Sequence, residues 1–163
     1  MTDAVPNYAE LPLGRFVDMV ASREPAPGGG ASAAVAVALA AALTAMAARF
    51  SADHLADAET IADRAEELRT RVMPLAQADA AAYGRVLDAY RTPRDDDEKR
   101  RRRIREALSE AADVPLSIAE VGVADRYTVE LGDFFEWVES SSIWKIVLCV
   151  YRCASSVGRT SIA

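Results

Sequence analysis

A chain of 163 residues with a net charge of −6 is long enough to form one domain with a buried core. Apolar residues make up 51% of it and charged residues 27%, which excludes a disordered tail. The acidic balance argues against a general nucleic-acid-binding protein, so we expect no nucleic acid among its partners.

The composition changes near residue 124. Ala supplies 31 of residues 1–124 but only 2 of residues 125–163, and both Trp and both Cys lie in the second stretch. We therefore predict a helical domain over 1–124 and an atypical C-terminal segment over 125–163 that is not an independent domain. The two cysteines, Cys149 and Cys153, form neither a zinc site nor a disulfide framework by their spacing, so no metal site is expected. The N-terminus lacks the basic and apolar regions of a signal peptide, and we expect a cytoplasmic protein.

The first 50 residues predict two helices separated by a glycine-rich loop. Apolar residues at helical spacing indicate a short amphipathic helix over 13–22. Two prolines and three consecutive glycines break the chain over 23–30, and an Ala-rich helix is predicted over 31–50. Residues 25–48 carry no charge and are numerous enough to span a membrane, but Ala offers little apolar area. We expect a central helix of a bundle and no membrane partner.

The next segment predicts a long packed helix. Ser51 or Asp53 is its candidate N-cap, and apolar positions between Ile61 and Tyr90 alternate in steps of four and three. Pro74 lies inside this pattern, so we expect it to kink the helix or to break it in two.

Charged residues mark the start of a further helix. The acidic run at 95–98 complements the dipole of a helix N-terminus, and basic residues follow at 99–103. Asp113 with Pro115 predicts the cap and first turn of a fifth helix. The first 124 residues contain no alternating strand pattern, so the predicted class is an all-α antiparallel bundle. Residues 143–151 fit a buried helix or a strand equally well.

The glycine-rich loop is the first candidate functional element. From Pro25 to Ser32 the chain reads Pro-Ala-Pro-Gly-Gly-Gly-Ala-Ser and leads into a helix. Glycines leave backbone N–H groups with little steric cover, and the helix N-terminus adds a positive dipole end. Such a loop holds an anion or a polar ligand edge, or it is a tight turn that serves packing alone. It is neither a Walker A loop nor a dinucleotide fingerprint.

Asp79 is the second candidate, because it occupies a seam position between Leu75 and Ala82 where the other positions are apolar. A carboxylate there must be paired, be hydrogen-bonded or face a cavity. A perturbed pKa in that setting is a common property of catalytic acids and bases. The alternative is that the seam widens after Pro74 and Asp79 reaches solvent.

Three further residues are weaker candidates. Tyr83 lies one turn after Asp79, where its ring can stack on a flat ligand and its hydroxyl can donate a proton, or where it forms the edge of the core. The basic run 100–103 is typical of a solvated helix face, although Arg100 or a neighbour can hold a carboxylate-bearing ligand. His54, the single histidine, is interpreted as a surface residue.

The order of these motifs resembles the cyclodeaminase/cyclohydrolase family of folate enzymes. The resemblance covers about residues 13–123, and the Pro-Gly-Gly-Gly element with its Ala-rich helix is its most specific part. The matching motifs, in chain order, are Phe16-Val17-Asp18, Pro25 to Gly30, Ser32 to Ala34 with Leu43 and Met46, Asp79 to Tyr83, Pro93, Ala107-Leu108 and Ala112 to Leu116.

This resemblance implies an elongated all-helical fold and a homodimer that holds a folate between helices and subunits. The implied chemistry is hydrolysis of 5,10-methenyltetrahydrofolate to 10-formyltetrahydrofolate, or ring closure of a formimino group with release of ammonia, with no metal or redox cofactor. The lack of a recognisable transferase domain favours the cyclohydrolase. The carboxylate of Asp79 would stabilise the cation and move a proton, with Tyr83 beside it. The residues expected to bind the substrate are Pro27, Gly28, Gly29, Gly30, Ser32 and Arg100.

The C-terminal segment departs from the family pattern, which is not recognisable after Val123. We interpret residues 125–163 as a replaced, frame-shifted, divergent or truncated end of the bundle. The alternative to an enzyme is a non-catalytic helical dimerisation module, which would not bind a folate.

Overall fold

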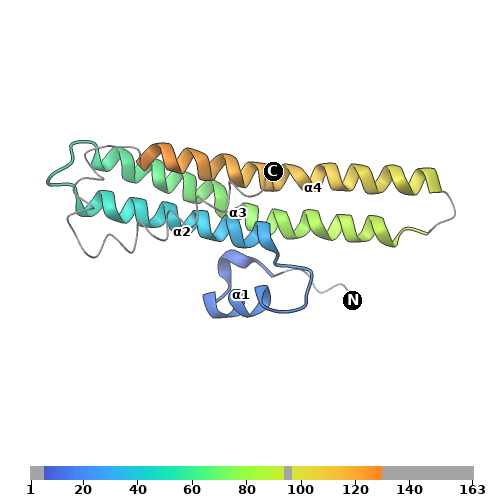
Figure 1. Cartoon of the computed structure of the whole chain (residues 1–163). Helices are drawn as coiled ribbons and strands as arrows, with labels where there is room; N and C mark the ends of the chain where they lie inside the picture. Colours follow the sequence, from blue (N-terminus) through green and yellow to red (C-terminus); the bar gives the residue numbers. More distant parts are fainter. Residues whose placement is uncertain (1–5, 94–96, 130–163) are drawn as a thin grey trace. The chain divides into compact units, whose positions relative to one another are not determined.

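A computed structural model of the chain describes residues 6–93 and 97–129 (Figure 1). Within these residues the regular structure is entirely helical, which confirms the all-α class. The elements are a 3₁₀ helix, η1 (Tyr8–Glu10), and the α-helices α1 (Leu13–Val20), α2 (Gly29–Phe50), α3 (Ala58–Arg91) and α4 (Asp97–Val129).

The chain divides into two compact units, and the three long helices each contribute to both. Of the described residues, the first unit contains 6–34, 73–93 and 97–118, and the second contains 35–72 and 119–129. The glycine-rich loop and the second half of α3 therefore belong to one unit, which contains the candidate site.

Small side chains pack the second unit. Ala48 of α2 forms an apolar cluster with Ile61 and Ala62 of α3. On α4, the position where a Cβ of Gly122 would lie is 3.4 Å from Val37 of α2, an approach that a larger residue would crowd. By its length and composition alone α2 could cross a membrane, and half of its most apolar window is buried; the core helix of a soluble protein passes the same test.

Aromatic and small residues form the core of the first unit. Tyr8 of η1 packs edge-on against Phe16 of α1, with 5.6 Å between the ring centroids. Ala82 and Val86 on α3 are buried, as the four-three spacing predicts. The apolar side chains that remain exposed on α1 are Leu13, Val17 and Val20.

Helix boundaries correct three expectations. Both Pro74 and Pro115 lie inside continuous helices, so Pro74 does not break α3 and no fifth helix begins near Asp113. An interior proline removes one backbone donor, and a helix anchored by packing on either side tolerates that loss. Neither Ser51 nor Asp53 is the N-cap of α3, because the helix begins only at Ala58. The hydroxyl of Ser51 instead donates to the carbonyl of Ala47 at the end of α2. The predicted boundary at residue 124 lies within α4.

Candidate functional site

Asp79 reaches from the middle of α3 to the first turn of α2. Its Oδ2 accepts a hydrogen bond from the backbone N–H of Ala31 at 3.0 Å. The first N–H groups of a helix have no partner within the helix, and their dipoles favour a negative charge. The carboxylate therefore caps α2 from a residue 48 positions away in sequence.

Gly30 is the glycine that this contact requires. A Cβ at position 30 would overlap the carboxylate of Asp79, whereas one at Gly29 would meet nothing within 4 Å. At Gly28 the nearest atom to such a Cβ would be 3.9 Å away, an ordinary contact. The described glycines all have negative φ, so Gly30 is needed for space and not for an unusual backbone conformation.

The rest of the loop supports the start of α2. Both the backbone N–H and the hydroxyl of Ser32 donate to the carbonyl of Gly28, at 3.0 and 2.9 Å. Pro27, preceded by a cis peptide bond, is buried. The loop therefore brings Gly30 and Ala31 against Asp79, while Ser32 uses its hydroxyl hydrogen within the loop. The binding roles of Pro27, Ser32 and the glycines stay predictions.

Burial sets the electrostatic character of Asp79. Desolvation raises the pKa of its carboxyl above the ordinary value, and the hydrogen bond from Ala31 acts in the opposite direction. No hydrogen bond from a described residue engages Oδ1. The carboxylate thus has one oxygen anchored on α2 and the other available to accept a proton or a further hydrogen bond.

Tyr83 lies one turn further along α3 and is 44% exposed. This exposure fits both interpretations from sequence, a residue at the edge of the core and one that contacts a ligand. The side chain remains open to a ligand that approaches the Asp79 region. Its part in the site stays a prediction.

Arg100 contacts the C-terminal end of α3. Its guanidinium donates to the carbonyls of Tyr90 and Thr92 at 3.2 and 3.3 Å, which closes the last turn of the helix. Tyr90 lies three turns beyond Asp79, about 16 Å along the helix axis. The structure therefore does not bring Arg100 together with Asp79, and its contact with a substrate stays a prediction.

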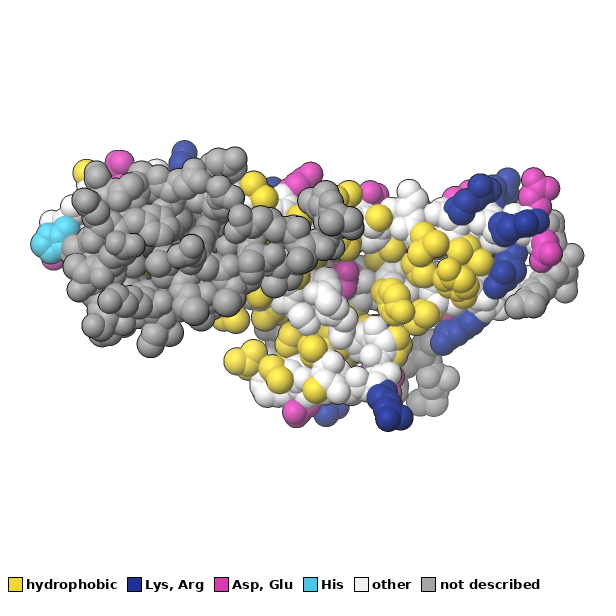
Figure 2. Space-filling model, viewed as in Figure 1, with side chains coloured by type: hydrophobic (Ala, Val, Ile, Leu, Met, Phe, Trp, Pro, Cys, Tyr) yellow, Lys and Arg dark blue, Asp and Glu magenta, His cyan; other side chains and the backbone are white. Residues whose placement is uncertain are grey.

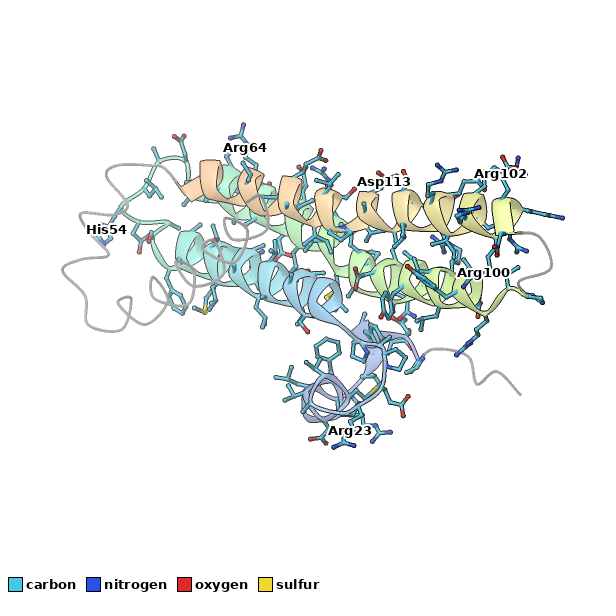
Figure 3. The ribbon with its side chains drawn as sticks, turned by 45° about the vertical axis from the view of Figure 1, so that its right-hand side comes forward. Arg23, His54, Arg64, Arg100, Arg102 and Asp113 are labelled. Carbon is cyan, nitrogen blue, oxygen red and sulfur yellow. The ribbon has the colours of Figure 1, made fainter. Side chains whose placement is uncertain are left out.

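The other charged candidates lie on solvated surfaces (Figures 2 and 3). Arg102 lies 3.7 Å from Glu106 one turn along, and Arg101 donates to the carbonyl of Asp97. These contacts fit the interpretation of the basic run as a solvated helix face. His54 is exposed in the loop between α2 and α3. Among the described residues no group of three acidic, His or Cys side chains is placed to hold a metal ion, and Cys149 and Cys153 lie outside them.

Two residues next to the site have no counterpart in the sequence predictions. The Oε1 atom of Gln77 accepts a hydrogen bond from the backbone N–H of Tyr8 at 3.2 Å, which holds η1 against α3. Tyr8 is 4% exposed, although it lies in a stretch that reads as irregular. The sequence offered one signal for this short helix, a candidate N-cap at Asn7. The side chain of Asn7 accepts a hydrogen bond from the backbone N–H of Ala9.

The fold and this site define a class of helical-bundle proteins in which a carboxylate from one helix meets the glycine-rich start of another. The sequence profile of the family described as formiminotransferase-cyclodeaminase matches residues 12–128, which is more than half of the chain. The chain belongs to this family.

Named relatives include enzymes of two activities. A methenyltetrahydrofolate cyclohydrolase from Methylorubrum extorquens is 35% identical over 115 residues, which cover 65% of this chain and 55% of the relative. A formimidoyltransferase-cyclodeaminase from Mus musculus is 35% identical over 123 residues, which cover 70% of this chain and 23% of that protein. The chain thus spans about half the length of the first relative and less of the second.

A solved structure has a similar fold. The crystal structure of formiminotetrahydrofolate cyclodeaminase from Thermotoga maritima superposes with a TM-score of 0.68 and 28% sequence identity. The match covers 95% of this chain and 81% of that one.

Proposed function

We propose that this chain is a folate one-carbon enzyme that hydrolyses 5,10-methenyltetrahydrofolate to 10-formyltetrahydrofolate. The observation that carries the proposal is the half-buried Asp79 carboxylate, anchored through Oδ2 on Ala31 and set against Gly30. The cyclohydrolase from Methylorubrum extorquens supports this choice of reaction. The tetrahydrofolate derivative is the substrate, and the proposal includes no cofactor.

In the proposed reaction Asp79 moves a proton. The oxygen of a water molecule bonds to the methenyl carbon between two folate nitrogens, and the carboxylate of Asp79 takes one proton from that water. The remaining hydroxyl proton passes to the nitrogen whose bond to this carbon breaks, and the formyl group stays on the other nitrogen. The negative charge of Asp79 also stabilises the cationic substrate before the attack.

The glycine-rich loop and Tyr83 are the proposed binding groups around this carboxylate. The backbone N–H groups of Gly28, Gly29 and Gly30 would hold a polar edge of the pterin or the glutamate end, supported by Pro27 and Ser32. Tyr83 would stack on the substrate or donate a proton. Arg100 would meet the glutamate carboxylates, and because its described contacts lie three turns from Asp79, only the distal end of a long substrate would reach it.

The direct test is turnover by an Asp79→Asn variant. We expect its kcat to fall by about 100-fold or more, because general acid–base catalysis contributes on that order, while its helical content is retained. The absorbance of methenyltetrahydrofolate follows the reaction, and circular dichroism checks the fold. Asp88→Asn is the matched control, since Asp88 lies on α3 in an exposed pair with Arg91 at 3.2 Å. Normal turnover by Asp79→Asn would remove this residue from the mechanism.

A second candidate reaction is the cyclodeaminase reaction, in which a folate nitrogen closes onto a formimino carbon and ammonia leaves. The solved cyclodeaminase structure from Thermotoga maritima favours it. Release of ammonia from formiminotetrahydrofolate, measured beside the hydrolysis assay, decides between the two. A protein that binds no folate in a calorimetric titration would instead be the non-catalytic dimerisation module.

We also propose that the chain acts as a homodimer in the cytoplasm. The exposed apolar residues Leu13, Val17 and Val20 share one face of α1 and supply surface that a second copy can cover. Analytical ultracentrifugation at micromolar concentration measures the assembly, and a monomer at all concentrations would contradict it.

A further inference from the structure

A stripe of apolar side chains lies exposed on α2. Its members recur in steps of four, three and four, so they share one face of the helix. They are Leu39, Leu43, Met46 and Phe50, which we call the α2 stripe. Leu39 is 51% exposed, Met46 37% and Phe50 74%, and Leu43 is half-buried. The stripe belongs to the second unit, whereas the candidate site belongs to the first.

The α2 stripe lies on the side of the helix that faces away from the core. The residues on the opposite side of α2, Ala41, Ala45 and Ala48, are buried. A helix covered on one side normally carries polar residues on the other, but α2 has no charged residue before Arg49. A helix that is apolar on all sides is typical of one that is covered on all sides. The stripe is therefore a contiguous apolar face that gains free energy when an apolar partner covers it.

The helix α4 ends level with this stripe, on the core side of α2. A Cβ at Gly122 of α4 would lie 3.4 Å from the side chain of Val37, so the two helices are in contact there. They run in the same direction (Figure 1), and seven further residues carry α4 about 10 Å along its axis to Val129. The end of α4 is thus about level with Thr44, and the chain continues from there as residues 130–163.

The continuing chain contains an apolar run of matching length. Residues 143–151 read Ile-Trp-Lys-Ile-Val-Leu-Cys-Val-Tyr, in which Lys145 is the one charged residue. A run of this length spans roughly 13 Å as a helix or about 30 Å as a strand, and the stripe is about 16 Å long, so either conformation covers most of it. Residues 130–142 reach up to about 40 Å, which is enough to pass around a helix about 10 Å in diameter.

We propose that residues 143–151 cover the α2 stripe of their own chain. A connection of this length gives the run an effective concentration on the order of millimolar at the stripe, which a second copy at micromolar concentration does not match. The contact removes the exposed apolar side chains from water and completes the core of the second unit. This docking does not depend on the proposed function, since it uses no residue of the candidate site.

Tryptophan fluorescence tests the docking, because both tryptophans of the chain, Trp137 and Trp144, follow α4. In a Trp137→Phe protein, Trp144 alone reports the surroundings of the apolar run. We expect Trp144 to emit at short wavelength and to resist quenching by acrylamide. Adding Leu39→Gln and Phe50→Gln should move the emission to longer wavelength and raise the quenching constant several-fold, because polar amides in the stripe disfavour an apolar cover.

Leu108→Gln with Leu116→Gln is the matched control for the stripe variant. These leucines are 45% and 57% exposed on α4 in the first unit, so the same change is made at two exposed apolar positions elsewhere. Circular dichroism checks that both double variants keep their helical content. The control should leave the emission and quenching of Trp144 unchanged. Equal quenching of Trp144 with and without the stripe substitutions overturns the proposal.

Cross-linking distinguishes the segment of the same chain from that of a second copy. Cys149 lies within the apolar run, and Met46 lies within the stripe. In a Met46→Cys, Cys153→Ser protein, a short bis-maleimide should join positions 46 and 149 within one chain, as mass spectrometry of the digested monomer shows. Leu116→Cys in place of Met46→Cys should give no such product. A link between two chains would show that a second copy covers the stripe, and either this result or the absence of a link between 46 and 149 overturns the proposal.

Discussion

At the scale of single residues, Asp79 combines a structural and a chemical property. Its Oδ2 caps α2 through Ala31, which is a stabilising contact, while burial raises the pKa of the carboxyl and so disfavours the charge that the cap uses. The ionised base proposed here therefore loses activity as the pH falls through this raised pKa, at a higher pH than an exposed aspartate would. A carboxylate whose charged form is stabilised by a helix start but disfavoured by burial is typical of functional sites.

The sequence predicted Asp79 because a charge in an apolar seam requires an explanation, and the glycine-rich loop because three glycines precede a helix. It did not predict that they touch, since the contact joins residues 48 positions apart and depends on how α2 and α3 pack. Tyr8 was missed for a related reason: one aromatic residue in a short polar stretch carries no periodicity, and its burial comes from Phe16 and Gln77.

Gly30→Ala tests the contact between the loop and Asp79. An added Cβ would overlap the carboxylate, so the helix start or Asp79 must move and the Ala31 hydrogen bond weakens. We expect the free energy of unfolding to fall by about 1–3 kcal/mol. Urea unfolding measures this loss. In Gly29→Ala the new Cβ has open space, so the same measurement should show no loss and a gain of up to about 1 kcal/mol. Equal stability of the two variants would show that Asp79 does not press against Gly30.

At the scale of elements, spacing predicted the helices well and their ends less well. Most seam positions are buried on α3, because apolar residues at steps of four and three share one helix face, while Leu75 and Asp79 are half-buried. The prolines were misleading about helix ends, because local rules end a helix at Pro74 and begin one at Pro115 whereas tertiary packing holds α3 and α4 continuous. Pro74 is exposed, so its ring meets solvent. Because proline has no backbone N–H, it also costs the helix one backbone hydrogen bond.

Pro74→Ala should therefore stabilise the protein. It restores a donor to the carbonyl of Thr70 in the preceding turn, a gain of roughly 3 kcal/mol by helix propensity, reduced by up to about 1 kcal/mol because proline restricts the unfolded chain. We expect a net gain of about 2 kcal/mol in urea unfolding. Pro93→Ala, in the exposed connection after α3, has no helix to repair and should be neutral or slightly destabilising. A loss of stability in Pro74→Ala would show that the ring is part of the packing of α3.

At the scale of the whole molecule, the composition break at residue 124 falls inside α4. The helix α4 continues to Val129 and the family profile to residue 128, so the Ala-rich composition ends a few residues before the helix does. The predicted aromatic stretch at 143–151 lies outside the described residues.

Ligand binding tests the molecule as a unit, because a folate that binds only the folded state stabilises it by mass action. At about 100 times its dissociation constant, 5-formyltetrahydrofolate should add about 2.7 kcal/mol, which raises the Tm of a domain of this size by about 5–10 °C. Differential scanning calorimetry measures the shift, with free glutamate at the same concentration as the control for a carboxylate effect. In Gly30→Ala the shift should shrink, because the loop and Asp79 no longer share their arrangement.

The same experiment separates the two classes of function. An enzyme that binds the folate shows a Tm that rises with ligand concentration at fixed protein concentration. A dimerisation module shows a Tm that rises only with protein concentration, because association of its own copies is then the one binding event that stabilises the folded state. A Tm indifferent to 5-formyltetrahydrofolate at millimolar concentration would therefore contradict the folate enzyme and leave the helical bundle as an assembly module.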